Sequence, residues 1–302
     1  MNSQIEKFIV CNLCGSDDYS IVYQAGEAQL SQIVKCTKCG LMYANPRKKN
    51  EDHVEIEAGD PELTLKRIYS GDLRKRVLKE EIQVNDYKKT KSFLQNQFPN
   101  QGKLLEVGSG FGYLLKYFKE VGWEVTGVEP SEALCRYAEE KNKINTISTV
   151  LEDSEIETGS IDVVLMMHVI EHVPDPQSTF QEVYRILKPG GVFIVETPCY
   201  DTLMFKLLGK RERSLSCDGH IYFFTADTLT QMANKSHFKL EKLERVGRTL
   251  TLDRLLFNVG VISKSKNFLT FLSRISHKLH LNKFVFSLNL RDMQRLYLRK
   301  ES

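Results

Sequence analysis

The chain has 302 residues, of which 41% are hydrophobic and 27% charged, and this balance is ordinary for a globular protein. Its length predicts about two domains. No apolar run approaches the roughly 20 residues that cross a bilayer, and the stretch MNSQIEKFIV lacks the basic and apolar regions of a signal peptide. We therefore expect a cytoplasmic protein without a transmembrane helix. The net charge of +3 is too small to indicate a nucleic-acid partner.

Two cysteine pairs lie near the start of the chain, Cys11 with Cys14 and Cys36 with Cys39. Each pair has a two-residue spacer and is followed by a glycine that permits a tight turn. Two such turns can present four thiolates in the tetrahedral array of a structural zinc site, and iron in a rubredoxin-like site is the alternative. We expect residues 1–46 to form a zinc-ribbon unit, because so short a segment needs a cross-link to be stable.

Residues 47–100 are mostly polar, and their apolar side chains are spaced as on one face of a helix. The spacing is clearest at Leu73, Val77, Leu78 and Ile82. We expect a helical connector here, followed by one larger domain over residues 101–302.

Short apolar segments and amphipathic segments alternate from residue 103 onward. Buried strands are predicted at 104–107, 123–128, 161–167 and 192–196, and an edge strand at 238–246. Helices are predicted between them. The helix that begins at Asp175-Pro176 has a capping residue and a first-turn proline, and it should end at Gly190-Gly191. This alternation predicts an α/β fold with a doubly wound, parallel sheet.

A glycine-rich turn, Gly108-Ser109-Gly110-Phe111-Gly112, follows the first of these strands. Such a turn lets the backbone approach a ligand closely, and the next helix offers it free N–H groups. Glu129, at the end of the second strand, can accept hydrogen bonds from the ribose of either NAD or S-adenosylmethionine. The third glycine comes one residue earlier than in the G-x-G-x-x-G pattern of nicotinamide sites. Glu106 would repel a pyrophosphate but suits an ammonium group, so S-adenosylmethionine is favoured.

Five motifs in order resemble the class I S-adenosylmethionine-dependent methyltransferases. They are the glycine turn, Val128-Glu129-Pro130-Ser131, Ser160-Ile161-Asp162-Val163-Val164, His168-Val169-Ile170-Glu171-His172-Val173 and Leu187-Lys188-Pro189-Gly190-Gly191. The resemblance covers residues 102–246 and implies a Rossmann-like sheet of seven strands with an antiparallel last strand. It also implies that residues 291–298 form this last strand and that residues 248–290 are an insertion before it.

The same resemblance implies which residues contact the cofactor S-adenosylmethionine. Those expected at its methionine end are Glu106, Gly108, Ser109, Gly110 and Gly112. Those expected at its ribose and adenine are Glu129, Pro130, Leu151 and Glu152, and His168 is expected beside the reacting centre.

His168, Glu171 and His172 follow the carboxyl end of a buried strand, where open α/β sheets bind ligands. If this segment is helical, the three side chains share one face. The arrangement is similar to one in ubiquinone-pathway O-methyltransferases that supports a metal ion or a base, although those enzymes carry a glutamate at the position of His168.

His220 begins a His-Ile-Tyr-Phe-Phe run similar to one that faces the acceptor pocket in related methyltransferases. An imidazole there can take a proton from an acceptor hydroxyl, because its pKa is near the working pH. We therefore expect His168, His172 and His220 to be the catalytic histidines. The alternative is that Glu171, His172 and His220 only brace their loops.

The resemblance implies methyl transfer from S-adenosylmethionine to a hydroxyl of a small molecule or glycan. Sugar C-methylation is an alternative, since the layout is also similar to deoxysugar C-methyltransferases, which carry a further large domain. A ribosomal-RNA methyltransferase is less favoured, because the cysteine unit lacks the histidine-containing signature of such enzymes. A non-catalytic cofactor-binding scaffold is disfavoured by the intact glycine turn and Glu129.

Residues 264–283 contain five Lys or Arg residues and no Asp or Glu. Their apolar residues at helical spacing are Phe268, Phe271, Leu272, Ile275 and Leu279, and an alternating, strand-like pattern follows at Phe284, Phe286, Leu288 and Leu290. A helix with one apolar and one cationic face can pack on the core or make peripheral contact with an anionic membrane. The sequence leaves both alternatives open.

Overall fold

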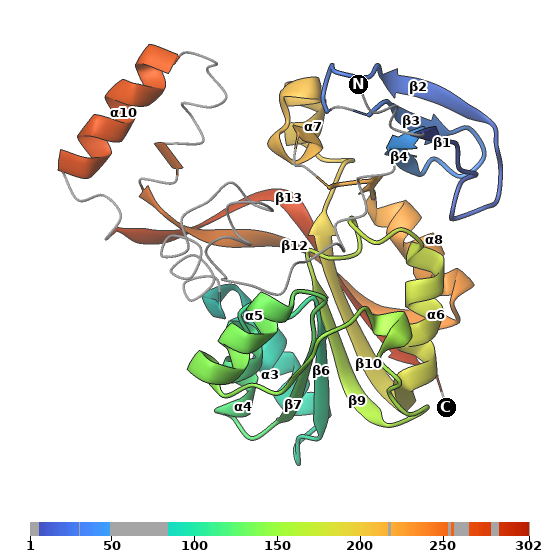
Figure 1. Cartoon of the computed structure of the whole chain (residues 1–302), viewed down its shortest axis with the longest axis vertical. Coiled ribbons are helices and arrows are strands. Elements are labelled where there is room, and N and C mark those ends of the chain that lie inside the picture. The colour runs from blue at the N-terminus through green and yellow to red at the C-terminus, as the bar shows by residue number, and fades with distance from the viewer. Residues whose placement is uncertain are drawn as a thin grey trace.

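The computed structural model describes residues 6–29, 31–48, 84–216, 219–252, 255–256, 266–278 and 284–301. A seven-stranded sheet lies at its centre, in the order β12-β13-β10-β9-β6-β7-β8 (Figure 1). The strands are β6 (Lys103–Val107), β7 (Glu124–Val128), β8 (Thr146–Ile147), β9 (Ile161–Met167), β10 (Leu187–Pro198), β12 (Phe238–Thr251) and β13 (Val285–Lys300). Strand β13 is antiparallel to β10 and β12, and the pairings among the other strands are parallel. The predicted α/β fold with an antiparallel last strand is confirmed.

Helices cover both faces of this sheet. On one face lie α3 (Lys88–Gln97) and α4 (Tyr113–Lys119), and on the other lie α6 (Pro176–Ile186) and α8 (Ala226–Lys235). Along β9, Val163 and Leu165 pack in the core cluster of α3 and α4, whereas Val164 packs in that of α6 and α8. Because both faces are buried, β9 is a continuous apolar run instead of an alternating one. A short helix, α5 (Glu132–Tyr137), follows β7.

Helix α6 begins where the sequence predicts but ends earlier. The Asp175 carboxylate accepts a hydrogen bond from a first-turn amide, and Pro176 occupies the first turn. The helix ends at Ile186 instead of Gly190-Gly191, because β10 already pairs with β9 at Leu187. Strand β10 then has a bulge between Leu187 and Val192, and its regular pairing with β9 resumes at Val192.

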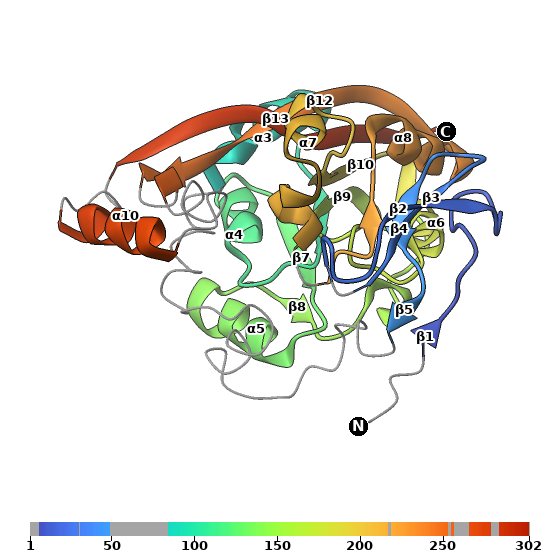
Figure 2. The same ribbon diagram turned by 90° about the horizontal axis from the view of Figure 1, so that it is seen from above.

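The N-terminal unit, residues 6–48, forms a second sheet of four strands in the order β11-β4-β3-β2 (Figure 2). Its own strands are β2 (Tyr19–Tyr23), β3 (Ile33–Cys36) and β4 (Met42–Ala44), and a small ribbon of β1 (Glu6–Lys7) and β5 (Arg47–Lys48) lies beside them. The fourth strand, β11 (Tyr222–Phe223), comes from the larger domain. The domain boundary expected at residue 46 therefore divides the four-stranded sheet, because β4 lies before this boundary and its partner β11 lies after it.

The helical connector expected over residues 47–100 is described only in part. Val84–Tyr87 form a 3-10 turn that leads into α3. The apolar residues on which the expectation rested, Leu73, Val77, Leu78 and Ile82, lie outside the described residues.

The insertion expected at residues 248–290 is largely a continuation of the two edge strands. Strand β12 runs on to Thr251 and β13 already begins at Val285, so the predicted start of the last strand at residue 291 is wrong. Arg291 has a φ of +58°, and the β12–β13 register shifts beside it, which bends the strand there. Between the strands lies α10 (Lys266–Lys278), which projects away from the sheet (Figure 1). Leu279, expected on the same helical face, lies outside the described residues.

Among the described residues, no helix combines the length and the apolar character needed to cross a membrane.

Candidate functional site

The carboxyl ends of β6, β7 and β9 meet at one edge of the sheet, and the glycine turn lies there. The Gly108 amide donates a hydrogen bond to the Val128 carbonyl at 2.7 Å, which ties the turn to the end of β7. Gly108 has a φ of +70°, and a Cβ at this position would collide with Val169 Cγ2. Gly112, with a φ of +74°, is the residue from which α4 starts. Both glycines are therefore required by the backbone that forms the turn.

Glu129 joins the turn to the start of α5. Its buried carboxylate accepts hydrogen bonds from the Gly110 amide at 3.0 Å and the Ser131 amide at 2.9 Å. A carboxylate offers about four acceptor positions, so hydroxyl groups of a ligand can be accepted as well. Ser109 Oγ is buried and has no hydrogen-bond partner among the described residues. Glu106 is buried in β6, two residues before the turn. The structure thus brings these predicted cofactor residues together.

The residues expected around adenine make contacts within the protein. Leu151, in the 3-10 turn Leu151–Asp153, is buried in the core cluster of α6 and α8. Glu152 Oε1 accepts a hydrogen bond from Thr179 Oγ1 at 2.6 Å. Pro130 is half-buried. Their roles at the adenine stay predictions.

His168 follows β9 directly and has a φ of +60°, in the left-handed region. Its Nε2 lies 3.2 Å from Glu196 Oε1, and its Nδ1 lies 3.8 Å from Glu171 Oε1. The next residues form a tight turn closed by a hydrogen bond from the His172 amide to the Val169 carbonyl at 2.8 Å. The helical face considered for His168, Glu171 and His172 is therefore wrong.

Glu196 belongs to a buried charge network that the sequence did not indicate. The Nη2 atom of Arg295 lies 2.5 Å from Glu196 Oε2. Arg295 also donates a hydrogen bond from Nη1 to Thr90 Oγ1 at 2.7 Å. Burial raises the pKa of Glu196, but the positive charges of Arg295 and His168 outweigh this effect and lower it to about 2. Glu196 lies within the apolar run of β10. A charged residue inside such a run is the one sequence signal that could have pointed to the pair.

Glu171, His172 and His220 come together from two loops, and one ligand atom from each lies within 4.8 Å of the others. His220 Nε2 is 4.0 Å from Glu171 Oε1, and the rings of His172 and His220 meet edge to face with centroids 4.6 Å apart. Glu171 is buried, and its other oxygen accepts a hydrogen bond from Thr197 Oγ1 at 2.8 Å. Two imidazoles and a carboxylate can hold a metal ion or move a proton.

The two imidazoles of this cluster are in different environments. His172 Nδ1 lies 2.8 Å from the Gly219 carbonyl, so Nδ1 carries the proton and Nε2 has the lone pair. His220 is buried, and its Nδ1 lies 3.4 Å from the Tyr200 hydroxyl. His172 is half-buried and is the more accessible of the two.

Hydrogen bonds connect this cluster to the N-terminal unit. The Glu171 carbonyl accepts hydrogen bonds from the Ile221 and Tyr222 amides at 2.9 Å and 3.1 Å, at the start of β11. Arg47 donates to the Pro174 carbonyl at 2.9 Å, and its guanidinium lies 4.7 Å from the centre of the Tyr222 ring. The N-terminal unit therefore contacts both loops that carry the histidines.

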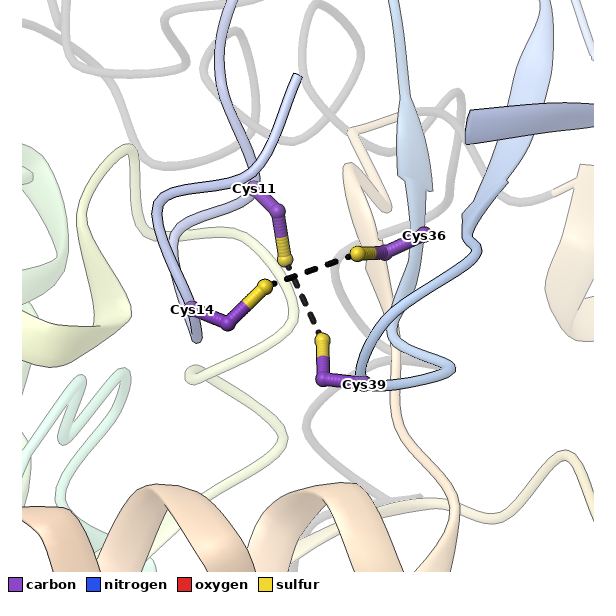
Figure 3. Close-up of side chains that lie close together, drawn as sticks. All are labelled: Cys11, Cys14, Cys36 and Cys39. Carbon is purple, nitrogen blue, oxygen red and sulfur yellow. Dashed lines mark hydrogen bonds between the residues drawn. The ribbon is translucent and has the colours of Figure 1, made fainter. Parts of the chain in front are cut away.

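The four N-terminal cysteines converge, with their sulfurs directed toward a common centre (Figure 3). The Sγ atoms of Cys11 and Cys39 are 3.4 Å apart, and those of Cys14 and Cys36 are 3.5 Å apart. Burial raises the pKa of Cys11 to about 11. Burial also acts to raise the pKa of Cys36, but backbone amides lower it to about 7. All four predicted metal ligands are thus close enough to bind one ion.

The sequence is similar to curated methyltransferases over part of its length. The ubiquinone biosynthesis O-methyltransferase of Actinobacillus pleuropneumoniae is 36% identical over 105 residues, which are 32% of this chain and 45% of the relative. The enzyme of the same name from Psychrobacter cryohalolentis is 31% identical over 150 residues, which are 45% of this chain and 58% of the relative. The chain thus spans about half the length of the curated relatives it matches.

A solved structure has the same fold. A SAM-dependent methyltransferase from Thermotoga maritima superimposes with a TM-score of 0.53 and 20% identity, covering 83% of this chain and 100% of that chain. The family model described as a methyltransferase domain matches residues 78–243, more than half of the sequence. The chain therefore belongs to the methyltransferase domain family.

Proposed function

We propose that the protein transfers a methyl group from S-adenosylmethionine to a hydroxyl group of a small molecule or glycan. The observation that carries the proposal is the position of Glu171, His172 and His220. They form a proton-accepting cluster at the same sheet edge as the glycine turn and Glu129. The curated relatives named as O-methyltransferases support a hydroxyl acceptor.

The residues around the glycine turn fit S-adenosylmethionine. Ser109 Oγ is buried without a hydrogen-bond partner among the described residues and can bind a polar ligand group. Glu129 has acceptor capacity for ribose hydroxyls, and Glu106 supplies negative charge for an ammonium group. The bound cofactor supplies an electrophilic methyl group on a positively charged sulfur.

His172 is the group best placed to take the proton of the acceptor hydroxyl. Its Nδ1 is held by the Gly219 carbonyl, so its Nε2 is the atom that can accept a proton. The fixed carboxylate of Glu171 then stabilises the imidazolium. His220, buried between Glu171 and Tyr200, positions this arrangement. This differs from the sequence expectation, in which His220 is the proton acceptor.

The same three side chains can instead hold a divalent cation that lowers the pKa of the acceptor hydroxyl. Dialysis against a chelator distinguishes the two mechanisms. Chelation is limited to conditions under which metal analysis shows that the cysteine cluster keeps its zinc. A proton-transfer cluster then keeps its activity, whereas a metal site loses activity and regains it when the divalent ion is restored.

We further propose that the four cysteines hold a structural zinc ion. A tetrahedral site with Zn–S bonds of about 2.3 Å has sulfurs about 3.8 Å apart. The Sγ–Sγ distances of 3.4 Å between Cys11 and Cys39 and 3.5 Å between Cys14 and Cys36 are close to this value. Four sulfur ligands leave no open position, so the ion stabilises the N-terminal unit and takes no part in catalysis.

Methyl transfer can be tested by incubating the protein with methyl-labelled S-adenosylmethionine and a panel of phenolic, glycan, amine and RNA acceptors. We expect label on oxygen, together with release of S-adenosylhomocysteine. Label on carbon supports the sugar C-methyltransferase alternative. Label on RNA, or tight NAD binding without S-adenosylmethionine binding, contradicts the proposal.

A further inference from the structure

Two helices lie beyond the sheet edge that carries the candidate site. Helix α7 (Leu203–Leu208) follows the carboxyl end of β10, and α10 follows that of β12. Both strands are antiparallel to β13, so they run in the same direction and their carboxyl ends share this edge. Figure 1 shows α7 and α10 at the same end of the long axis of the molecule, and Figure 2 looks onto that end.

Each of these helices exposes large apolar side chains. On α7, Leu203 and Leu207 are one turn apart and 71% and 72% exposed. On α10, Phe268 and Phe271 are 39% and 57% exposed. A helix packed on the core through this face would bury both rings, whereas in α10 the Phe271 ring is mostly exposed and the Phe268 ring partly exposed. Exposed apolar side chains on two separate helices at one end of a molecule indicate an interaction surface.

Positive charges accompany both apolar faces. Lys206 lies in α7 and Arg211 just after it, whereas Lys210, also just after α7, is paired with Glu27 Oε1 at 3.3 Å. The only acidic residue between positions 203 and 212 is Glu212. On α10, Arg274 and Lys278 are exposed. The segment around α10, residues 264–283, contains no acidic residue. This surface therefore complements one that is both apolar and negatively charged.

We propose that α7 and α10 together dock the protein on an anionic lipid bilayer, with the candidate methyl-transfer edge facing the membrane. The leucines and phenylalanines enter the boundary between headgroups and acyl chains, and the flanking cations bind anionic headgroups. The docking does not depend on the proposed methyl transfer. If both hold, the acceptor is presented at a membrane surface, as a lipid-linked compound is.

Flotation with lipid vesicles tests the proposal. We expect the protein to float with vesicles of phosphatidylcholine mixed with phosphatidylglycerol, to float poorly with phosphatidylcholine alone, and to be released by high salt. Replacing Arg274→Glu together with Lys278→Glu should weaken binding at least about tenfold. The pairs Leu203→Ser with Leu207→Ser, and Phe268→Ser with Phe271→Ser, should each weaken it too.

The matched control is Lys103→Glu together with Lys239→Glu. These lysines lie at the amino ends of β6 and β12, at the opposite edge of the sheet, and both are exposed. Vesicle binding should not change in this variant, and thermal melting should show that all variants are folded. Absence of binding to anionic vesicles, or equal loss in the control pair, overturns the proposal. Dimers in size-exclusion chromatography that the α7 or α10 variants dissociate, without vesicle binding, assign the surface to a second copy instead.

Discussion

His220 and Glu171 are held together by both side-chain and backbone contacts. His220 Nε2 lies 4.0 Å from Glu171 Oε1, and the amide next to His220, that of Ile221, donates to the Glu171 carbonyl at 2.9 Å. The second carboxylate oxygen of Glu171 accepts a hydrogen bond from Thr197. The carboxylate is therefore held in place beside two imidazoles, where it can accept a hydrogen bond from either ring.

The first prediction concerns His172. The substitution His172→Ala should lower turnover about 100-fold or more, because it removes the proposed proton acceptor. The affinity for S-adenosylmethionine should not change, since the glycine turn and Glu129 are intact. The acidic limb of the pH–rate profile should disappear as well. His237→Asn is the control: His237 is exposed and has a φ of +64°, a conformation that asparagine tolerates. A parallel loss of turnover, cofactor affinity and thermal stability would show that His172 is structural.

Local sequence patterns predicted β6, β7, β9 and the regular part of β10, because each contains a short apolar run bounded by turn residues. They did not predict β8, which has only two residues. Ile161–Met167 is confirmed to the residue as β9. The patterns failed where long-range pairing decides a boundary. Strand β10 starts at Leu187 because its partner is already there, and β13 starts at Val285 because β12 extends to meet it.

The candidate site was predictable only in its separate parts. The glycine turn and Glu129 follow from local spacing. No local pattern brings His220 to Glu171, because the two are joined through β11 and its pairing with β4 of the N-terminal unit. The left-handed backbone of His168 likewise depends on its surroundings, and it is the reason that the expected helical face does not form.

The second prediction concerns Glu129. The substitution Glu129→Ala should weaken S-adenosylmethionine binding at least tenfold, because hydrogen bonds to a charged acceptor contribute about 1.5–3 kcal/mol each. Glu129→Gln should weaken it less, since an amide oxygen still accepts. Isothermal titration calorimetry measures both affinities. Glu132→Gln, on the exposed surface of α5, is the control and should bind as the unaltered protein does. Unchanged affinity in Glu129→Ala contradicts the assignment of this residue to the ribose.

The third prediction concerns the cysteine cluster. Protein purified without chelators should contain about one zinc ion per chain. Cys36→Ser should lose the ion and lower the melting temperature, because metal binding stabilises the fold of such a unit. Turnover should also fall while cofactor affinity is retained, since β4 of this unit pairs with β11 next to His220. The control is Cys135→Ser, which changes a buried cysteine outside the cluster and should keep the zinc. Metal analysis that finds no zinc in the unaltered protein removes the proposal.

The last prediction concerns the stability of the Glu196–Arg295 pair against pH. Burial raises the pKa of Glu196, but the charge of Arg295 dominates and lowers it from 4.5 to about 2. Because the pKa is lower in the folded state, the stabilisation is present above about pH 4.5 and is lost as the pH falls toward 2. Such a shift corresponds to about 3 kcal/mol of stability at neutral pH. Urea unfolding from about pH 7 to about pH 3 should therefore show the advantage of the unaltered protein over Glu196→Gln shrinking below about pH 4.5. The cysteine cluster is the same in both proteins, so its own acid sensitivity cancels in the difference.

Arg295→Met leaves the Glu196 carboxylate buried without its cation. The substitution should lower the free energy of unfolding by about 3–5 kcal/mol at neutral pH, and by less in acid, where the carboxyl group is protonated. A difference between the unaltered protein and Glu196→Gln that stays constant over the whole range would show that the pair contributes no pH-dependent stability.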